Sequence, residues 1–147
     1  MITHSVEIDR SPDEVFTYLA QLDRHHEWQA EIVSTRVVTE GPTRAGTQVV
    51  DTRRMGSREQ EVAYEVTEHD PPRRSAFRGT AGPIRPTGAV TVEPLDGGAR
   101  SRVTIELDLR GHGLMGMLLV PLARRQARAS VPSSHAKLKE VLEQGGV

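Results

Sequence analysis

The sequence predicts an α+β fold in which an antiparallel sheet packs on one face against helices. The order of the segments leads to this prediction: one strand-like segment, a helical segment, six strand-like segments in a row, and a long helical segment at the end. Parallel strands need a crossover helix between them, so six consecutive strands exclude a doubly wound sheet. A chain of 147 residues suits a single domain, expected to span residues 1–147.

The first strand is expected at residues 5–9, where polar and apolar residues alternate with the period of a half-buried strand. A helix should begin directly after it. Ser11 suits the N-cap, Pro12 suits the first helical position, and Glu14 completes a capping box. A short polar segment follows this helix and ends at Trp28, a large apolar anchor.

Six further strands are expected, because alternating segments are separated by turn residues at the spacing of an antiparallel meander. They cover residues 32–39, 47–55, 59–68, 75–80, 88–93 and 101–110. In the third of these segments Val62, Tyr64 and Val66 share one face and the polar residues share the other. One face of the sheet is therefore expected to contact water.

The last element is predicted to be a long helix beginning after residues 111–113. Leu114, Leu118 and Leu122 form a row at helical spacing. Pro132 lies inside this pattern, and a proline removes one backbone hydrogen bond and clashes with the preceding turn. A kink, or a break and restart, is expected near residues 131–132.

Composition excludes several classes of protein. The chain has 19 basic and 20 acidic residues, and this balance argues against a nucleic-acid binder. It has no cysteine, which excludes disulfides, thiolate nucleophiles and cysteine-ligated metal sites. The longest apolar stretch, at about ten residues, is too short to cross a bilayer. With no signal-peptide pattern visible, we expect a cytoplasmic protein without stable membrane insertion.

Several motifs in order resemble one superfamily. They are Ser-Pro-Asp-Glu-Val-Phe at residues 11–16, Trp28, Gly46-Thr47, Tyr-Glu-Val-Thr-Glu at 64–68 leading to Pro-Pro-Arg-Arg at 71–74, and residues 137–143 of the terminal helix. Together they resemble the SRPBCC superfamily of START-like and birch-pollen-allergen-like domains, and within it the bacterial polyketide cyclase/dehydrase and lipid transport proteins. The segment 130–134, with Pro132, departs from the unbroken helix that such proteins have.

The resemblance implies a helix-grip fold. In this fold a seven-stranded curved antiparallel sheet wraps around a long C-terminal helix, with one or two short helices after the first strand and a cavity between sheet and helix. The sequence allows such a cavity, because the apolar strand faces are built largely from Val, Ala and Gly. The alternative is a densely packed core, as most protein interiors have.

The cavity is expected to hold a hydrophobic or amphipathic small molecule, such as a lipid, an isoprenoid or a polyketide-like aromatic. The residues expected to line it are Trp28, Tyr64, Phe77, Met115 and Leu119. We predict mainly apolar walls with at most one or two polar groups, no metal and no cofactor. The protein is expected to be a monomer or a homodimer.

Catalytic candidates are few. Arg53 and Arg54 lie on opposite faces of one strand, so one of them could face the cavity and bind a carboxylate or carbonyl; the alternative, that both lie on the outer face or an edge, is favoured because arginine is rarely buried. Arg78, Tyr64 and His112 are further candidates, each with a structural interpretation as well.

Three patterns receive structural interpretations. The adjacent side chains of His25, His26 and Glu27 diverge, so a solvated loop is favoured over a metal site. The G-x-G-x-x-G at residues 111–116 lacks the following parallel strand of a dinucleotide site, so a sharp turn is favoured. Arginines 124, 125 and 128 most simply form a solvated face, with an acidic partner or a membrane surface as the alternative.

Two other classes of function stay open beside ligand binding. One is a polyketide aromatase/cyclase or dehydratase, which needs little more than a cavity and one or two polar groups. The other is a protein-interaction module without ligand, which would have a filled cavity and an exposed apolar patch.

Overall fold

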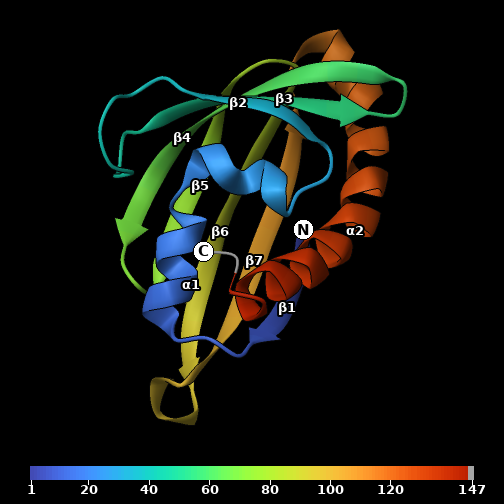
Figure 1. Ribbon diagram of the computed structural model, residues 1–147. Coiled ribbons are helices and arrows are strands. Elements are labelled where there is room, and N and C mark those ends of the chain that lie inside the picture. The colour runs from blue at the N-terminus through green and yellow to red at the C-terminus, as the bar shows by residue number, and fades with distance from the viewer. Residues whose placement is uncertain (146–147) are drawn as a thin grey trace.

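The computed structural model describes residues 1–145, in which seven strands form one sheet and the helices lie on one of its faces (Figure 1). The elements are β1 (Ile2–Ile8), α1 (Pro12–Leu19), the 3-10 helix η1 (Leu22–Glu27), β2 (Ile32–Val37), β3 (Gln48–Met55), β4 (Arg58–Asp70), β5 (Arg74–Ala81), β6 (Ile84–Leu95), the 3-10 turn η2 (Asp96–Gly98), β7 (Arg100–Gly111) and α2 (Gly113–Glu143). The predicted α+β fold and its helix-grip form are confirmed.

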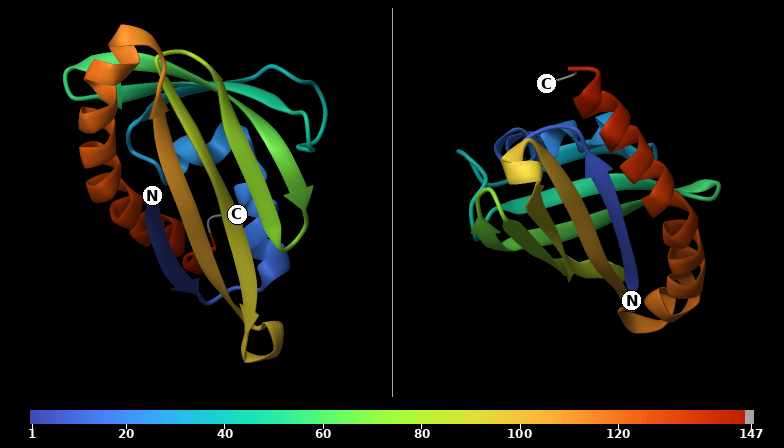
Figure 2. Two further views of the ribbon diagram at one scale, coloured as in Figure 1. Left: turned by 180° about the vertical axis from the view of Figure 1, so that it is seen from behind. Right: turned by 90° about the horizontal axis from the view of Figure 1, so that it is seen from below.

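The sheet is an antiparallel meander with the order β1-β7-β6-β5-β4-β3-β2. The pairing of β4 with β5 shifts register between Ala63 and Tyr64 and again between Val66 and Glu68. Such bulges bend a strand and increase its twist. The sheet is accordingly strongly curved, with its open face toward the helices and its other face bare (Figure 2).

Helix α1 begins as its sequence predicts. The Ser11 side chain accepts a hydrogen bond from the backbone N–H of Glu14, and Pro12 is the first residue of the helix. The Ser11 hydroxyl also donates to the Glu14 carboxylate at 3.1 Å. Val15, Phe16 and Tyr18 are buried on the side that faces the sheet.

Helix α2 runs without a break from Gly113 to Glu143, so the predicted break near residues 131–132 is wrong. The helix changes direction about midway instead (Figure 1), which agrees with the alternative of a kink. Ala123 before Pro132 and Leu138 after it are both buried, so packing on each side keeps the helix continuous. Among residues 1–145, no helix is long and apolar enough to cross a membrane.

The glycines before and within the start of α2 make a sharp turn from β7 into the helix. Gly113 has a φ of 71°, a conformation that favours glycine. A Cβ atom on Gly116 would lie 2.4 Å from the Pro83 carbonyl oxygen. The segment 111–116 is therefore a close-packed turn, as the sequence indicated.

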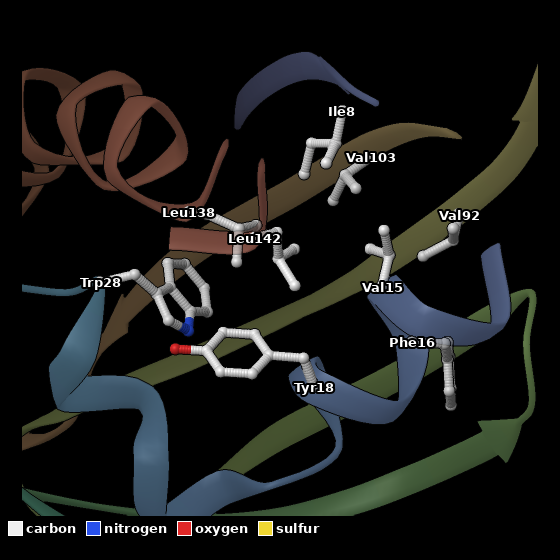
Figure 3. Close-up of a cluster of buried hydrophobic side chains, with 9 residues drawn as sticks. All are labelled: Ile8, Val15, Phe16, Tyr18, Trp28, Val92, Val103, Leu138 and Leu142. Carbon is white, nitrogen blue, oxygen red and sulfur yellow. The ribbon is translucent and has the colours of Figure 1, made fainter. Parts of the chain in front are cut away.

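Two apolar clusters hold α2 against the rest of the fold. The first, shown in Figure 3, comprises Ile8, Val15, Phe16, Tyr18, Trp28, Val92, Val103, Leu138 and Leu142. The second comprises Met55, Ile84, Leu109, Leu119, Val120 and Ala123. The two clusters pack against different parts of α2, and the helix between them faces the curved sheet.

Candidate ligand-binding cavity

A cavity of about 230 Å³ lies between the sheet and the helices. Its wall takes side chains from every layer of the fold. They include Phe16 and Leu19 of α1, His25 and Trp28 at η1, Tyr64 and Val66 of β4, Phe77 of β5, Ile105 and Leu107 of β7, and Ala123, Ala127 and Ser130 of α2. The dense core that the sequence left open as an alternative is absent from this part of the described structure.

Aromatic side chains form much of the apolar wall. Tyr64 and Phe77 are neighbours across β4 and β5, with ring centroids 5.9 Å apart in an edge-to-face arrangement. Trp28 packs against the His25 ring at 5.2 Å. These contacts fix large, flat surfaces around a space that suits an apolar molecule.

One side of the cavity carries polar and charged side chains, which we call the polar cluster: Gln29, Glu31, Asp51 and Arg53. The Arg53 guanidinium donates to Gln29 at 2.8 Å and to Glu31 at 3.0 Å, and one of its nitrogens lies 3.3 Å from Asp51. Asp51 is almost fully buried and also accepts a hydrogen bond from the Thr35 hydroxyl at 2.8 Å. The Arg53 guanidinium is thus paired with two carboxylates.

Two other titratable side chains interact electrostatically with this cluster. Burial, together with the negative charge of Asp51, raises the pKa of the Tyr64 hydroxyl, which therefore stays protonated at neutral pH. Burial lowers the pKa of His25. The His25 Nε2 lies 2.8 Å from the Leu19 carbonyl oxygen and must donate to it, so Nδ1 is the basic nitrogen of this neutral ring.

Most of the polar cluster was not predicted from the sequence. The expectation of at most one or two polar groups is wrong, and so is the outer-face alternative for Arg53. Alternation carries the signal that was overlooked: Val49 and Met55 are buried on the concave face, so Asp51 and Arg53, two positions apart between them, share that face. His25 lines the cavity, so the solvated-loop interpretation of its segment is wrong for this residue.

A second histidine in the wall makes an unusual contact. His135 of α2 is 3% exposed, and its Nδ1 lies 2.7 Å from Nδ1 of His4 in β1. One ring must donate and the other must accept. Burial, reinforced by His4, lowers the pKa of His135 to about 4.

Two buried polar atoms of cavity-lining residues have no hydrogen-bond partner among the described residues. They are Nε1 of Trp28 and Nδ1 of His69. A buried polar group without a partner is costly. Figure 3 shows the indole nitrogen on the side of Tyr18, so His69 is the more suitable of the two for contact with a bound molecule.

The structure brings three of the five predicted lining residues to the cavity, namely Trp28, Tyr64 and Phe77. It places Met115 and Leu119 outside the wall. Met115 is 48% exposed, and Leu119 is buried in the second apolar cluster. The reason is that the first turns of α2 pack against the β5–β6 turn and the end of β7, so the helix reaches the cavity only from Ala123 onward.

Two of the catalytic candidates lie away from the cavity. Arg78 points to the outer face of the sheet, where it pairs with Glu65 at 3.3 Å. His112 is exposed at the N-cap of α2 and does not line the cavity. The described residues contain no group of three or more potential ligands that could hold a metal ion.

Comparison with known proteins identifies the family. The family model described as "Polyketide cyclase / dehydrase and lipid transport" matches residues 1–143. The chain belongs to this family. An uncharacterised protein of Mycobacterium tuberculosis is 28% identical over 140 residues, covering 95% of this chain and 94% of its own.

Solved structures of low sequence identity share the fold. A protein from Thermus thermophilus has a TM-score of 0.76 at 21% identity, covering 99% of each chain. A START superfamily protein from Mycobacterium smegmatis has a TM-score of 0.75 at 14% identity, covering 97% of each chain. The Zhui aromatase/cyclase from a Streptomyces species has a TM-score of 0.71 at 16% identity, covering 99% of this chain and 96% of its own. Family and fold point to hydrophobic ligand binding or a polyketide cyclase role.

Proposed function

We propose that the protein binds an amphipathic small molecule whose apolar body fills the cavity and whose polar group meets the polar cluster. The observation that carries this proposal is an aromatic and aliphatic cavity that has hydrogen-bonding groups concentrated on one side. Pockets for small molecules combine apolar walls with a few placed polar groups in this way. The filled cavity that the protein-interaction alternative requires is not present in the described structure.

The polar cluster favours an uncharged polar group over a carboxylate. Arg53 is already paired with Glu31 and Asp51, so an anion added at this cluster would meet two carboxylates beside the one guanidinium. The Tyr64 hydroxyl lines the cavity and has no hydrogen-bond partner among the described residues. It is suited to donate a hydrogen bond to a carbonyl or hydroxyl oxygen of the ligand. We therefore infer a neutral, oxygen-bearing ligand such as a ketone, a phenol or an isoprenoid alcohol.

The test compares two ligands that share one hydrocarbon chain, a methyl ketone and the corresponding carboxylate. Trp28 is the only tryptophan and lies in the cavity wall, so its emission reports binding. The ketone should change the emission and raise the melting temperature, and the carboxylate should bind more weakly. Tighter binding of the carboxylate would refute the charge argument, and binding of neither, with no small molecule extracted from purified protein, would refute ligand binding.

A filled-cavity variant supplies the structural control. Ala127 of α2 lines the cavity, so Ala127→Phe should abolish the response to the ketone. Ala136 lies on the same helix but is exposed, so Ala136→Phe should bind as the wild type does. An equal response from both variants would place the ligand elsewhere.

A second candidate function is a cyclase or dehydratase acting on a poly-β-carbonyl chain. The observation that favours it is that the protonated Tyr64 hydroxyl, which can donate a hydrogen bond, and the neutral His25 ring, which can accept a proton, line the same cavity. Such groups assist enolisation and loss of water. Turnover of a short poly-β-carbonyl mimic, followed by mass spectrometry, tests this function.

Matched variants separate catalysis from binding. Tyr64→Phe and Arg53→Ala should lower product formation by more than they lower ligand affinity, while Arg78→Ala and His112→Ala, which lie outside the cavity, should leave product formation unchanged. Absence of product with all mimics, together with binding of the ketone, would leave binding as the function.

A further inference from the structure

The first half of α2 exposes an apolar face to solvent. Leu114, Met117 and Leu118 are 75%, 72% and 68% exposed, and Leu122 is 46% exposed. Their spacing of three, four and eight residues places them on one side of the helix. We call these four residues the apolar face. The opposite side of the same turns, which includes Leu119, is buried, so this helix is apolar on both sides.

Positive charge follows the apolar face along α2. From Leu109 to Lys139 the sequence has no Asp or Glu, while it has four arginines and two lysines. Arg125 and Arg128 are exposed, and helical spacing places them on the side of the apolar face, one to two turns further along. Neither forms a salt bridge with the described residues.

The exposed apolar side chains and the neighbouring arginines together indicate what binds to this face. A second copy bound by two-fold symmetry would bring two sets of arginines into one interface without acidic partners. An anionic bilayer supplies both an apolar interior for the leucines and negative charge for the arginines. We propose that the apolar face docks the protein onto anionic lipid membranes, with Arg125 and Arg128 contacting the phosphates.

The position of the apolar face determines how the cavity lies relative to a bound membrane. The first half of α2 lies at one edge of the molecule (Figure 1). Ala123, Gln126 and Ala127 of the same helix line the cavity on its other side. A docked α2 is therefore the element that separates the cavity from the bilayer. The docking itself depends only on the outer face and is independent of the cavity's ligand.

The test is sedimentation of the full chain with vesicles, without any cavity ligand. The protein should bind phosphatidylglycerol-containing vesicles, should bind pure phosphatidylcholine much more weakly, and should dissociate as salt is raised. Leu118→Ser should weaken binding about tenfold or more. Arg125→Gln and Arg128→Gln should each weaken it about fivefold. All three side chains are exposed, so the fold should be retained.

Control variants lie on the hairpin of β2 and β3. Val38 is 49% exposed and Arg36 is exposed, so Val38→Ser and Arg36→Gln remove the same kinds of group at a distant site and should bind vesicles as the wild type does. Failure of the wild type to bind anionic vesicles would overturn the proposal, as would an equal loss in the control variants. A concentration-dependent dimer that Leu118→Ser dissociates would assign the face to a second copy instead.

Discussion

His135 makes the stability of the fold depend on pH, and its replacement by glutamine tests this. The ring is 3% exposed, where α2 packs on β1, and its Nδ1 lies 2.7 Å from Nδ1 of His4. Burial and His4 hold the pKa of His135 at about 4 in the folded protein, against 6.5 for an ordinary histidine. Protonation is therefore easier in the unfolded chain than in the folded one.

The direction in which stability changes with pH follows from this difference in pKa. A pKa lowered on folding leaves stability at its full value above about pH 6.5, and stability falls as the pH drops toward 4 because the unfolded chain takes up the proton first. A shift from 6.5 to about 4 corresponds to a total loss of roughly 3 kcal/mol, of which about 2 kcal/mol is lost by about pH 5. His135→Gln keeps a hydrogen-bonding side chain but removes this titration.

Urea unfolding at about pH 7.5 and about pH 5 gives the measurement. The wild type should lose about 2 kcal/mol more than His135→Gln between these two values. Burial also lowers the pKa of His25, but His25 is present in both proteins, so its effect cancels in the comparison. His26→Gln, which alters an exposed histidine, should behave as the wild type does. Equal losses of unfolding free energy in the wild type and in His135→Gln would refute this explanation. A measured pKa near 6.5 for the His135 ring would refute it as well.

Three further predictions concern stability and are checked by the same unfolding measurements. Gly88→Ala should destabilise by about 3 kcal/mol, because the new Cβ would lie 2.2 Å from the Glu106 carbonyl oxygen, while exposed Thr87→Ala should change little. Asp51→Asn should lower the free energy of unfolding by about 2 kcal/mol, a loss limited because Arg53 keeps Glu31 and Gln29 as partners. Asp70→Asn, at a side chain that is 46% exposed, should have little effect. Leu138→Ala should cost about 3 kcal/mol, because Leu138 is fully buried in the first apolar cluster.

The fold could be predicted because its local signals agree with its topology. Helix α1 begins where its capping residues Ser11, Pro12 and Glu14 indicate. The seven segments with alternating residues correspond to the seven strands of the sheet. Strand ends differed by a few residues; β6, for example, begins at Ile84 instead of residue 88. Of the two outcomes expected at Pro132, a kink or a break, the break does not occur, because buried residues pack on both sides of the proline and keep the helix continuous.

The site was harder to predict, because curvature decides which side chains meet. Tyr64 and Phe77 are adjacent across two strands, and their apolar character already indicated a wall. The polar cluster joins the loop after η1 to β3, and no spacing in the sequence reveals that Gln29 and Glu31 meet Arg53. Met115 was misplaced because helical spacing gives the faces of α2 without showing where along its length the sheet ends.

The cavity follows from how residue sizes are distributed along α2. Leu119 and Val120 pack the helix near its start, and Leu138 and Leu142 pack it near its end. Between them the residues of α2 that line the cavity include Ala127, Ser130 and Ser134, whose short side chains leave open space beneath them. The two clusters fix the distance between helix and sheet, so this space does not collapse. For that reason Ala127→Phe should exclude a ligand without loosening the fold, because it adds apolar contact where the native helix leaves space.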